Sequence, residues 1–348
     1  MTKPLTPDYK MYEKPYHRED LSKYSFLITG GAGFIGSNLA EYLMKYKARK
    51  VRVLDNLSTG HLYNIQNFFP DPAFEFVKGD IRNLNDCKAA VTDMDFVFHQ
   101  AALGSVPRSI LDPISSNEVN ISGFLNMLVA VKESKVKRMV YAASSSTYGD
   151  SKSLPKVEEN IGNPLSPYAV TKYVNELYAN VFVRTYKMEL IGLRYFNVFG
   201  PRQDPNGAYA AVIPKFVYQL LNHQSPVING DGEHSRDFTF VENVVQANML
   251  AMFAGNPDAI NTVYNVAYGE QTSLNQLVES LRKYLSTDDA SIAEIKVVHG
   301  PNREGDIPHS LASIGKAKKQ LGYAPQFDFT EGLRRAVEWY RSNPVSPA

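Results

Sequence analysis

The sequence predicts an α/β fold in which a doubly wound parallel sheet carries a smaller C-terminal substrate lobe. From residue 25 onward, short apolar runs alternate with stretches of helical periodicity, a pattern typical of a parallel sheet covered on both faces. A glycine-rich turn directly follows the first apolar run, as in sheets of this kind that bind nucleotides. The 348 residues, of which 44% are hydrophobic and 21% charged, supply enough apolar material for a large core.

Six strands are expected in the first part of the chain, in the order in which its apolar runs occur. They are placed at residues 26–29, 50–54, 75–79, 96–100, 138–144 and 189–195. Helical patterns separate these runs at residues 34–46, 83–91, 118–134 and 168–186. Strands that alternate with helices in this way form βαβ units, whose strands lie parallel in one sheet.

The pattern changes after residue 196, where Gly, Pro, Asn and Asp become frequent. In this part we expect a substrate lobe, with segments that cross back to the main sheet. Its predicted elements are a strand at 262–266 and helices near 214–222, 273–285 and 331–340.

The first residues form a third unit, because they are charged, rich in Pro and Tyr, and without an apolar period. We expect an arm lying on the surface, with a short helix around residues 18–24. The chain therefore divides into an N-terminal arm (1–24), a sheet domain (25–196) and the lobe (197–348).

Composition excludes several classes of function. The 37 basic and 36 acidic side chains give a net charge of +1, which argues against a nucleic-acid surface. The single cysteine, Cys87, excludes a disulfide framework and a cysteine-based zinc cluster, and no metal site is expected. No apolar run approaches the roughly 18 residues of a membrane span, and the N-terminus lacks the apolar stretch of a signal peptide. We therefore expect a cytoplasmic protein that acts on a small molecule and has no nucleic-acid or membrane partner.

The glycine-rich turn TGGAGFIG predicts binding of a dinucleotide in a Rossmann-like domain. Its glycines, Gly30, Gly33 and Gly36, allow a tight turn and close approach of the backbone to a pyrophosphate. The helix that opens at Phe34 and Ile35 then presents free N–H groups to that anion. The next strand ends about 20 residues later in Asp55 and Asn56, where a carboxylate binds the adenosine ribose and repels a 2′-phosphate. This pattern favours NAD over NADP.

Further residues after the third and fourth strands are expected to line the NAD site. The pair Gly79–Asp80 is placed to meet the adenine, and small residues after His99 let the backbone pass beneath the dinucleotide. His99 itself is interpreted as a packed histidine at a strand end. The additional residues expected to contact NAD are Asp80, Ile81, Gln100, Ala101, Ala102 and Asn120.

Two features indicate acid–base chemistry. The fifth strand ends in AASSSTYG, which places Ser144 at the carboxyl edge of the sheet, where ligands bind in open α/β folds. The segment YAVTK places Tyr168 and Lys172 at positions i and i+4, on one face of a helix. An adjacent ammonium and a positively charged nicotinamide would lower the pKa of the phenol. Tyr168 could then take a proton from a substrate hydroxyl while Ser144 holds the same oxygen.

With these motifs the chain resembles the extended short-chain dehydrogenase/reductase family. From about residue 25 to 340 it is most similar to nucleotide-sugar C4-epimerases of the UDP-galactose 4-epimerase type, in particular the UDP-N-acetylglucosamine 4-epimerases of bacterial surface-polysaccharide pathways. The segments that carry this similarity, in order, are NVFGPRQ (197–203), GEHSRDFTFVENV (232–244), YNVAYGE (264–270) and REGDIPHS (303–310).

The resemblance implies a mechanism and a catalytic set. Ser144, Tyr168 and Lys172 match the catalytic residues of the family, and NAD stays tightly bound throughout turnover. Tyr168 removes the proton of the C4 hydroxyl while hydride passes to the nicotinamide. The 4-keto sugar then turns over in the pocket and receives the hydride on its other face.

The resemblance also separates epimerases from related enzymes of other reaction types. The 4,6-dehydratases carry an Asp–Glu pair where this chain has Ser145 and Ser146, because elimination of water needs an acid and a base. The decarboxylases carry a Glu at the position of Ser146. Without these carboxylates the chain is expected to oxidise and reduce C4 only.

Several residues match the family's contacts to a UDP-sugar. Arg236 and Arg303 match arginines that hold the diphosphate, a task to which a bidentate guanidinium is suited. Asn197 matches a residue that holds the sugar nucleotide, and Asp306 one near the uridine ribose. The other residues expected to contact the substrate are Ser105, Ser144, Ser145, Ser146, Tyr168, Gln203, Val212 and Ser310.

Ser310 is expected to determine which sugar is accepted. Hexose-restricted relatives carry a Tyr at this position, and a Ser leaves room for an N-acetyl group beside C2. Gly104 stands where those relatives carry a Lys near the cofactor phosphates, so either Arg202 or another Lys or Arg supplies that charge, or it goes unsupplied. We therefore expect interconversion of UDP-N-acetylglucosamine and UDP-N-acetylgalactosamine for a surface polysaccharide.

The sequence is also compatible with other substrates and functions. UDP-glucose or UDP-glucuronate could be the substrate, and the uronate would need a cation near C6. A dehydrogenase that releases NADH and a non-catalytic NAD sensor are further alternatives, although a sensor of this type usually lacks the Tyr or the Lys. A homodimer is expected through the helices at 118–134 and 168–186.

Overall fold

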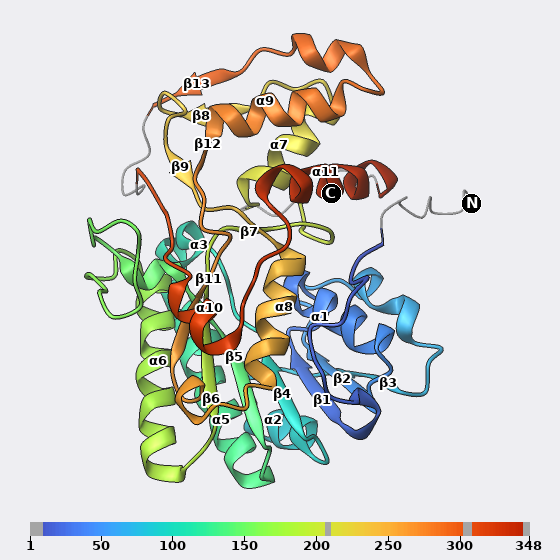
Figure 1. The fold of residues 1–348 in the computed structure, drawn as a ribbon, viewed down its shortest axis with the longest axis vertical. Helices are drawn as coiled ribbons and strands as arrows, with labels where there is room; N and C mark the ends of the chain where they lie inside the picture. The colour runs from blue at the N-terminus through green and yellow to red at the C-terminus, as the bar shows by residue number, and fades with distance from the viewer. Residues whose placement is uncertain (1–9, 206–209, 302–307, 344–348) are drawn as a thin grey trace.

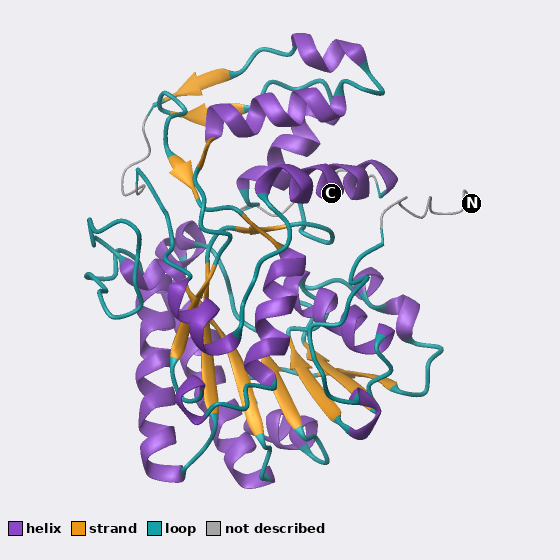
Figure 2. Cartoon of the chain, in the orientation of Figure 1, coloured by secondary structure: helices purple, strands orange, loops and turns teal. Residues whose placement is uncertain are grey.

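Seven parallel strands form the central sheet of the computed structural model, which describes residues 10–205, 210–301 and 308–343 (Figures 1 and 2). Their order is β11-β6-β5-β4-β1-β2-β3, and every neighbouring pair is parallel. The expected fold class is therefore confirmed. The strands are β1 (Ser25–Thr29), β2 (Lys50–Asp55), β3 (Phe74–Lys78), β4 (Phe96–His99), β5 (Arg138–Ser144), β6 (Leu190–Tyr195) and β11 (Val263–Val266).

Helices cover both faces of this sheet (Figure 1). On one face α1 (Phe34–Lys45) and α8 (Val241–Met252) share an apolar core with the sheet. On the other face α2 (Leu84–Val91), α5 (Gly123–Ser134) and α6 (Pro167–Tyr186) form a second core. Strands that are buried on both faces read as continuous apolar runs, which is why their positions are evident in the sequence.

Helix α8 is the largest element that the sequence did not indicate. Nearly all of its residues are buried, so it has no polar face and hence no amphipathic stripe. Two short helices were also not expected, α3 (Val106–Leu111) and α4 (Pro113–Asn117), whereas α10 (Gly315–Leu321) lies between residue 301 and the C-terminal helix, where a helix is expected. The helix expected at 118–134 begins with a π-helical turn at Glu118–Ser122, which continues into α5.

The smaller lobe lies beyond one end of the sheet (Figure 1). Its core is formed by α7 (Val212–Leu221), α9 (Leu274–Leu285) and α11 (Phe329–Ser342). Its strands β8 (Val227–Asn229) and β13 (Val298–Gly300) form a parallel pair. Two further pairs complete the architecture: β7 (Val198–Phe199) with β10 (Thr239–Phe240), and β9 (Ser235–Arg236) with β12 (Thr272–Ser273).

The N-terminal arm is anchored in the core, contrary to the expectation that it lies on the surface. Tyr12 and Tyr16 are both buried. The Tyr12 N–H and the Tyr16 hydroxyl each donate a hydrogen bond of 2.8 Å to Oε1 of Glu242 on α8. The Tyr12 hydroxyl donates to Oδ1 of Asn38 on α1, also at 2.8 Å. The arm thus joins α1 to α8, and among its described residues, 10–24, the only helical part is the single 3-10 turn Leu21–Lys23.

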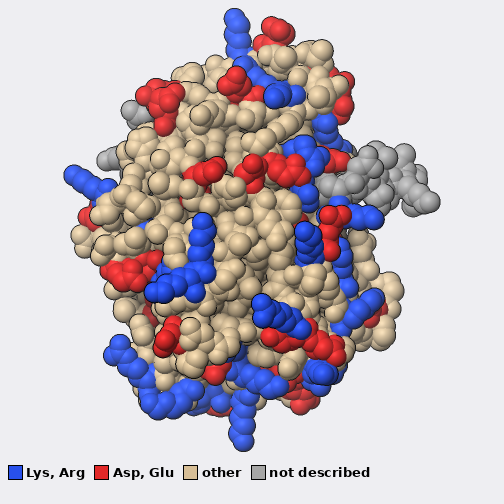
Figure 3. All heavy atoms as spheres, viewed as in Figure 1, with Lys and Arg blue, Asp and Glu red and all other residues tan. Residues whose placement is uncertain are grey.

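Basic and acidic side chains are interspersed over the face of the molecule shown in Figure 3. Within the described residues, no helix is both long enough and apolar enough to cross a membrane. The same residues contain no group of three or more His, Cys, Asp or Glu side chains that could hold a metal ion.

Candidate active site

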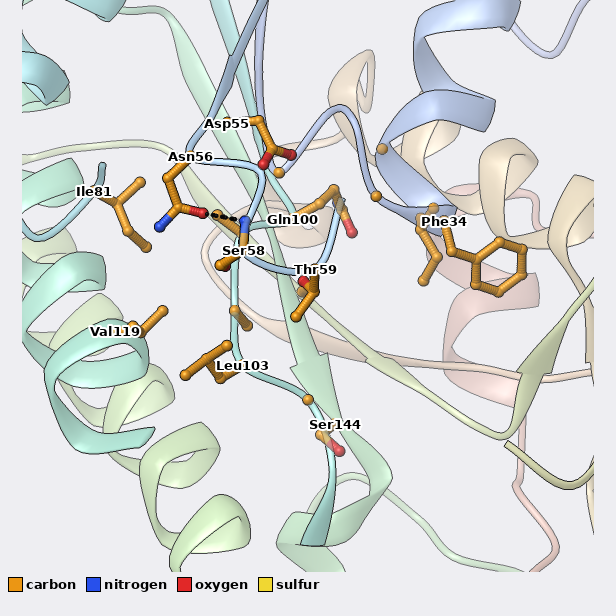
Figure 4. A pocket seen from close by; sticks show the side chains of 18 of the residues that line it. Phe34, Asp55, Asn56, Ser58, Thr59, Ile81, Gln100, Leu103, Val119 and Ser144 are labelled. Atoms are coloured by element: carbon orange, nitrogen blue, oxygen red, sulfur yellow. Dashed lines mark hydrogen bonds between the residues drawn. The ribbon is translucent and has the colours of Figure 1, made fainter. Parts of the chain in front are cut away.

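A cleft of about 450 Å³ opens where the carboxyl ends of β1, β2, β4 and β5 meet. The strand order reverses at β1, which lies between β2 and β4, and ligands bind at such switch points in open α/β sheets. Asp55 and Asn56 lie at one end of this cleft and Ser144 at the other (Figure 4). Ile81 and Val119 line one side and Phe34 the opposite side, so residues from six different elements and loops converge here (Figure 4).

The glycine turn forms a cradle from which side chains are excluded. Gly30 has a φ of +67°, and a Cβ there would lie 2.7 Å from the backbone of Ala101. A Cβ on Gly36 would lie 2.3 Å from the carbonyl oxygen of Gly30. Gly33 is the N-cap residue of α1 and lines the cleft, so the free N–H groups of the helix face it. This backbone arrangement fits a pyrophosphate.

Asp55 is held in place by backbone donors at the end of β2. Its carboxylate accepts hydrogen bonds from the N–H groups of Ala32 (2.9 Å) and Leu57 (2.8 Å), and burial raises its pKa. Asn56 donates a hydrogen bond of 2.9 Å to Asp80. Asp80 also forms an ion pair of 2.7 Å with Arg82, and these bonds lower its pKa to about 2. Both carboxylates and Asn56 line the cleft.

The floor of the cleft is formed by Gln100, Ala101 and Ala102, directly after β4. His99, one residue earlier, is buried and lies 2.8 Å from the hydroxyl of Thr29. Burial lowers the pKa of His99 to about 3, so the ring is neutral and is not poised to act as a base.

Asn120 acts on the cleft indirectly. It is not among the described residues that line the cleft, although its neighbour Val119 is. Its side chain accepts a hydrogen bond from the N–H of Leu103 (2.8 Å) and donates one to the carbonyl of Leu103 (3.1 Å). Asn120 therefore fixes the segment that follows β4 rather than facing the cleft itself.

Tyr168 and Lys172 lie on the first turns of α6, whose N-cap is Ser166. Lys172 is buried and Tyr168 is half-buried, and both line the cleft. The Lys172 ammonium donates a hydrogen bond of 2.9 Å to the carbonyl oxygen of Ala142 on β5. Burial lowers the pKa of this ammonium to about 8. The helix thus presents a phenol and an amine together at the end of β5.

Burial raises the pKa of Tyr168, whereas a hydrogen bond with the Ser144 side chain lowers it. The lowering of this pKa predicted from the sequence includes the positive charge of a nicotinamide, which the chain alone does not carry. Ser144 accepts hydrogen bonds from the N–H (3.1 Å) and the hydroxyl (2.9 Å) of Ser146. Its own hydroxyl proton is directed toward Tyr168, in the hydrogen bond that lowers the pKa of the phenol.

A second cleft, of about 310 Å³, adjoins the first at Ser144. It is lined by polar and small side chains together with aromatic and apolar ones. The expected substrate residues found there are Ser144, Ser145, Ser146, Asn197, Arg236 and Ser310. Ser144 is the residue that lines both clefts, so the proposed chemistry lies at their junction.

The other expected substrate residues are placed differently. Gln203 lines the first cleft. Ser105 is the N-cap of α3 and Val212 is the first residue of α7, and neither is among the described residues that line the two clefts. Arg303 and Asp306 lie outside the described residues.

Two cations in the clefts were not selected from the sequence. Arg108, on α3, lines the first cleft close to Gly104. Arg202, which the sequence analysis offered as the cation near the cofactor phosphates, instead forms an ion pair of 2.6 Å with Glu41 on α1. Lys156 lines the second cleft. Neither Arg108 nor Lys156 belongs to a sequence pattern, because tertiary contacts bring each of them to its cleft.

Arg236 and Asp237 illustrate how adjacent residues separate in the fold. Arg236 donates hydrogen bonds to the carbonyls of Ser235 (2.9 Å) and Pro308 (3.2 Å). Asp237 points inward, where it accepts hydrogen bonds from the N–H groups of Gly269 (3.2 Å) and Ala312 (3.1 Å). Burial raises the pKa of Asp237 to about 7.

Comparison with known proteins relates this site to enzymes of sugar-nucleotide metabolism. Residues 27–336 match the family model of GDP-mannose 4,6 dehydratase. UDP-glucose 4-epimerase of Mycolicibacterium smegmatis is 34% identical over 319 residues, which are 91% of this chain and 98% of that protein.

Two solved structures are also similar. UDP-N-acetylglucosamine 4-epimerase from Methanobrevibacter ruminantium, in complex with UDP-N-acetylmuramic acid, has a TM-score of 0.84 and 40% identity, covering 92% of this chain and 98% of that one. UDP-glucuronic acid 4-epimerase from Bacillus cereus, in complex with UDP-glucuronic acid and NAD, has a TM-score of 0.82 and 30% identity. The match covers 91% of this chain and 99% of that one.

Proposed function

The chain belongs to the GDP-mannose 4,6-dehydratase family, and from this premise we propose that it interconverts UDP-N-acetylglucosamine and UDP-N-acetylgalactosamine. It is an NAD-dependent nucleotide-sugar 4-epimerase of the extended short-chain dehydrogenase/reductase type. The observation that carries the proposal is the junction of the two clefts. There the hydroxyl of Ser144 meets the phenol of Tyr168, with Lys172 beside them.

The lining of the second cleft favours epimerisation over dehydration. Its described residues include no Asp and no Glu. Elimination of water between C5 and C6 needs an acid and a base beside those carbons. Ser145 and Ser146, which occupy the corresponding positions, can donate and accept hydrogen bonds but cannot act as a general base at neutral pH.

The residues of the first cleft fit NAD. The glycine cradle and the start of α1 suit the pyrophosphate, and the Asp55 carboxylate suits the adenosine ribose. When bound, NAD supplies the acceptor for the hydride that leaves C4 and returns it to the keto sugar.

The chain's own side chains handle the proton. Ser144 donates a hydrogen bond to the C4 oxygen and orients it toward Tyr168, which removes the proton. The ammonium of Lys172 stabilises the phenolate form in which Tyr168 accepts this proton, and the transfer leaves Tyr168 as the neutral phenol. On the return step the same phenol gives its proton back to the C4 oxygen.

The N-acetyl preference is supported by Ser310. Its side chain lines the second cleft, and its backbone N–H donates to the carbonyl of Ser235 at 3.1 Å, which fixes the position of the residue. A serine here leaves space that a larger side chain would fill.

A panel assay tests the whole proposal. Purified protein is incubated in turn with UDP-glucose, UDP-N-acetylglucosamine and UDP-glucuronate, without added NAD, and the products are separated by chromatography. We expect a higher kcat/KM with UDP-N-acetylglucosamine than with UDP-glucose. A preference for UDP-glucose would overturn the N-acetyl assignment, and activity that requires added NAD would instead indicate a dehydrogenase. Bound NAD without turnover of any sugar would indicate a sensor.

We propose in addition that two copies associate through the face formed by α3, α4 and α6. Helices α3 and α4 pack against α6, and together they expose large apolar side chains. The most exposed are Ile110 (60%), Leu111 (75%), Ile114 (70%) and Val181 (55%). The helix α5, which the sequence analysis included, contributes none of the strongly exposed apolar residues described.

Light scattering tests this dimer. We expect the mass of two chains for the wild-type protein and of one chain for the double variant Leu111→Glu/Val181→Glu. Val227→Glu, at an exposed apolar position in the smaller lobe, is the control and should leave the dimer intact. A monomeric wild-type protein would contradict the proposal.

A further inference from the structure

Lys156 lies beside the residue that is expected to determine sugar specificity. Its N–H donates to the carbonyl of Leu311, and its carbonyl accepts from the N–H of Ser313, both at 2.8 Å. These bonds form a short parallel bridge centred on Ala312. The backbone of Lys156 is thereby fixed next to the segment that carries Ser310, and both residues line the second cleft.

The ammonium of Lys156 is enclosed without a counter-ion. The residue is only 4% exposed, and among the described residues its side chain makes one hydrogen bond, to the carbonyl of Ser151. An ammonium has three donors, so two are left for other partners. No ion pair involves it in the described part of the chain. A buried cation of this kind is costly to desolvate, and burial accordingly lowers the pKa of Lys156.

The two carboxylates that follow Lys156 closely in the chain have other partners. Glu158 accepts a hydrogen bond of 2.8 Å from the N–H of Asn265. Glu159 forms an ion pair of 3.6 Å with Lys316. The backbone carbonyl of Lys156 is itself fixed by the Asn265 amide, at 3.0 Å. The protein thus holds this segment firmly and leaves the positive charge uncompensated.

The second cleft contains one other described cation, Arg236, and no described carboxylate. Arg236 lies on β9 and is proposed to meet the diphosphate of the substrate. Lys156 comes from a different segment and lines the same cleft as the three serines that are expected to contact the sugar. Because Arg236 is the described cation assigned to the diphosphate, the presence of Lys156 in this cleft needs another explanation.

We propose that Lys156 is a specificity-determining residue whose ammonium binds a carboxylate carried by the sugar of the substrate. This inference rests on the proposed 4-epimerase function and extends its substrate class to UDP-hexuronic acids. The carboxylate supplies the counter-charge that the cleft lacks, and an ion pair formed in an enclosed site discriminates strongly against neutral sugars. An acetamido group is neutral, so it can be accommodated beside Ser310 and hydrogen-bonded by serines without this cation.

Kinetics of three proteins on three substrates test the inference. Wild-type protein, Lys156→Met and Lys156→Arg are assayed for kcat/KM with UDP-glucuronate, UDP-glucose and UDP-N-acetylglucosamine. Loss of one partner of an enclosed charge pair predicts a fall of about 30-fold or more for Lys156→Met with UDP-glucuronate. With the two neutral sugars the same variant should stay within about 3-fold of wild type. Lys156→Arg, which keeps the charge, should restore most of the activity with the uronate.

The possible results distinguish carboxylate binding by Lys156 from a structural role of this residue and from failure of the proposed 4-epimerase function. An equal loss on all three substrates, or a loss confined to UDP-N-acetylglucosamine, would overturn the inference, as would a wild-type protein that turns over neutral sugars but not the uronate. A wild-type protein that turns over none of the sugars would overturn the proposed function. Should Lys156→Met melt at a much lower temperature, Lys156→Gln, which can still donate to the Ser151 carbonyl, takes its place in the same comparison.

Discussion

The ammonium of Lys172 lies 6.0 Å from the centre of the Tyr168 ring, one helical turn away on the same face of α6. Its hydrogen bond to the carbonyl of Ala142 ties this face of the helix to β5, the strand that ends in Ser144. The three side chains proposed to be catalytic are therefore brought together where this helix packs against this strand. Because the ammonium is tethered to a carbonyl, its charge stays at a fixed place beside the phenol.

The first prediction concerns the phenol itself. Tyr168→Phe removes the proton acceptor while keeping the ring that fills the buried site, so we expect epimerisation to fall by ~1000-fold or more. Folding and NAD content should stay close to wild type. Activity is measured by product separation, and bound NAD by absorbance after denaturation. Tyr178→Phe, on the same helix and outside both clefts, is the control, and turnover by Tyr168→Phe at the wild-type rate would remove this residue from the mechanism.

The second prediction concerns the pH dependence of stability. The folded chain without cofactor lowers the pKa of Lys172 from its ordinary value of 10.5 to about 8, so unfolding takes up a proton between these two values. At low pH the charged, buried ammonium lowers the free energy of unfolding. This loss disappears as the pH rises from about 8 to 10.5. Relative to Lys172→Met, which has no such proton, the wild-type protein should gain about 2 kcal/mol of unfolding free energy between about pH 7.5 and about pH 9.5.

Urea unfolding of NAD-free wild-type protein and Lys172→Met at both pH values measures this difference. Taking the difference between the two proteins cancels the contributions of the other titrating groups. A gap that does not change with pH would show that Lys172 is not desolvated in the folded chain.

The third prediction concerns the charge near the cofactor phosphates. Arg108 lines the dinucleotide cleft, and Arg108→Ala should weaken NAD binding by about 10-fold, the effect of losing one charge-assisted hydrogen bond. A Cβ on Gly104 meets no atom within 4 Å, so Gly104→Lys can be introduced without a clash. In the double variant we expect the added lysine to restore NAD binding.

Calorimetric titration of NAD into cofactor-free protein distinguishes the outcomes. Arg184→Ala, at an exposed position on α6, serves as the control for loss of an arginine. Unchanged affinity in Arg108→Ala would show that this guanidinium does not reach the phosphates. Lost affinity that Gly104→Lys does not restore would indicate a structural role for Arg108 in α3.

The parts of the fold that could be predicted from the sequence are those whose pattern is local. The strands β1, β4, β5 and β6 are buried on both faces, so each appears as an apolar run, and the glycine cradle requires glycine at fixed spacing. Tyr168 and Lys172 were found in the same way, because positions i and i+4 share a helix face. In these cases the residues that define the structural feature lie close together in the sequence.

The parts that could not be predicted depend on contacts between distant residues. Helix α8 is buried on all sides and has no period, and the arm is fixed by Glu242, more than 200 residues away, through Tyr12 and Tyr16. Lys156 enters the sugar cleft only because its segment pairs with residues 311–313. None of these positions carries a local signal, since its role is defined by the partner that the fold brings to it.

The last prediction concerns the space beside Ser310. A tyrosine ring introduced here would fill part of the second cleft, because the side chain lines that cleft and its backbone is fixed by the bond to Ser235. Ser310→Tyr should therefore lower kcat/KM with UDP-N-acetylglucosamine by at least about 10-fold and leave UDP-glucose within about 3-fold of wild type. Ser310→Ala, which keeps the space and removes only the hydroxyl, should retain the N-acetylated substrate. Since a ring that merely disturbed the segment at 309–313 would also displace Lys156 and impair every sugar, an equal loss on both substrates would contradict a role for Ser310 in admitting the N-acetyl group.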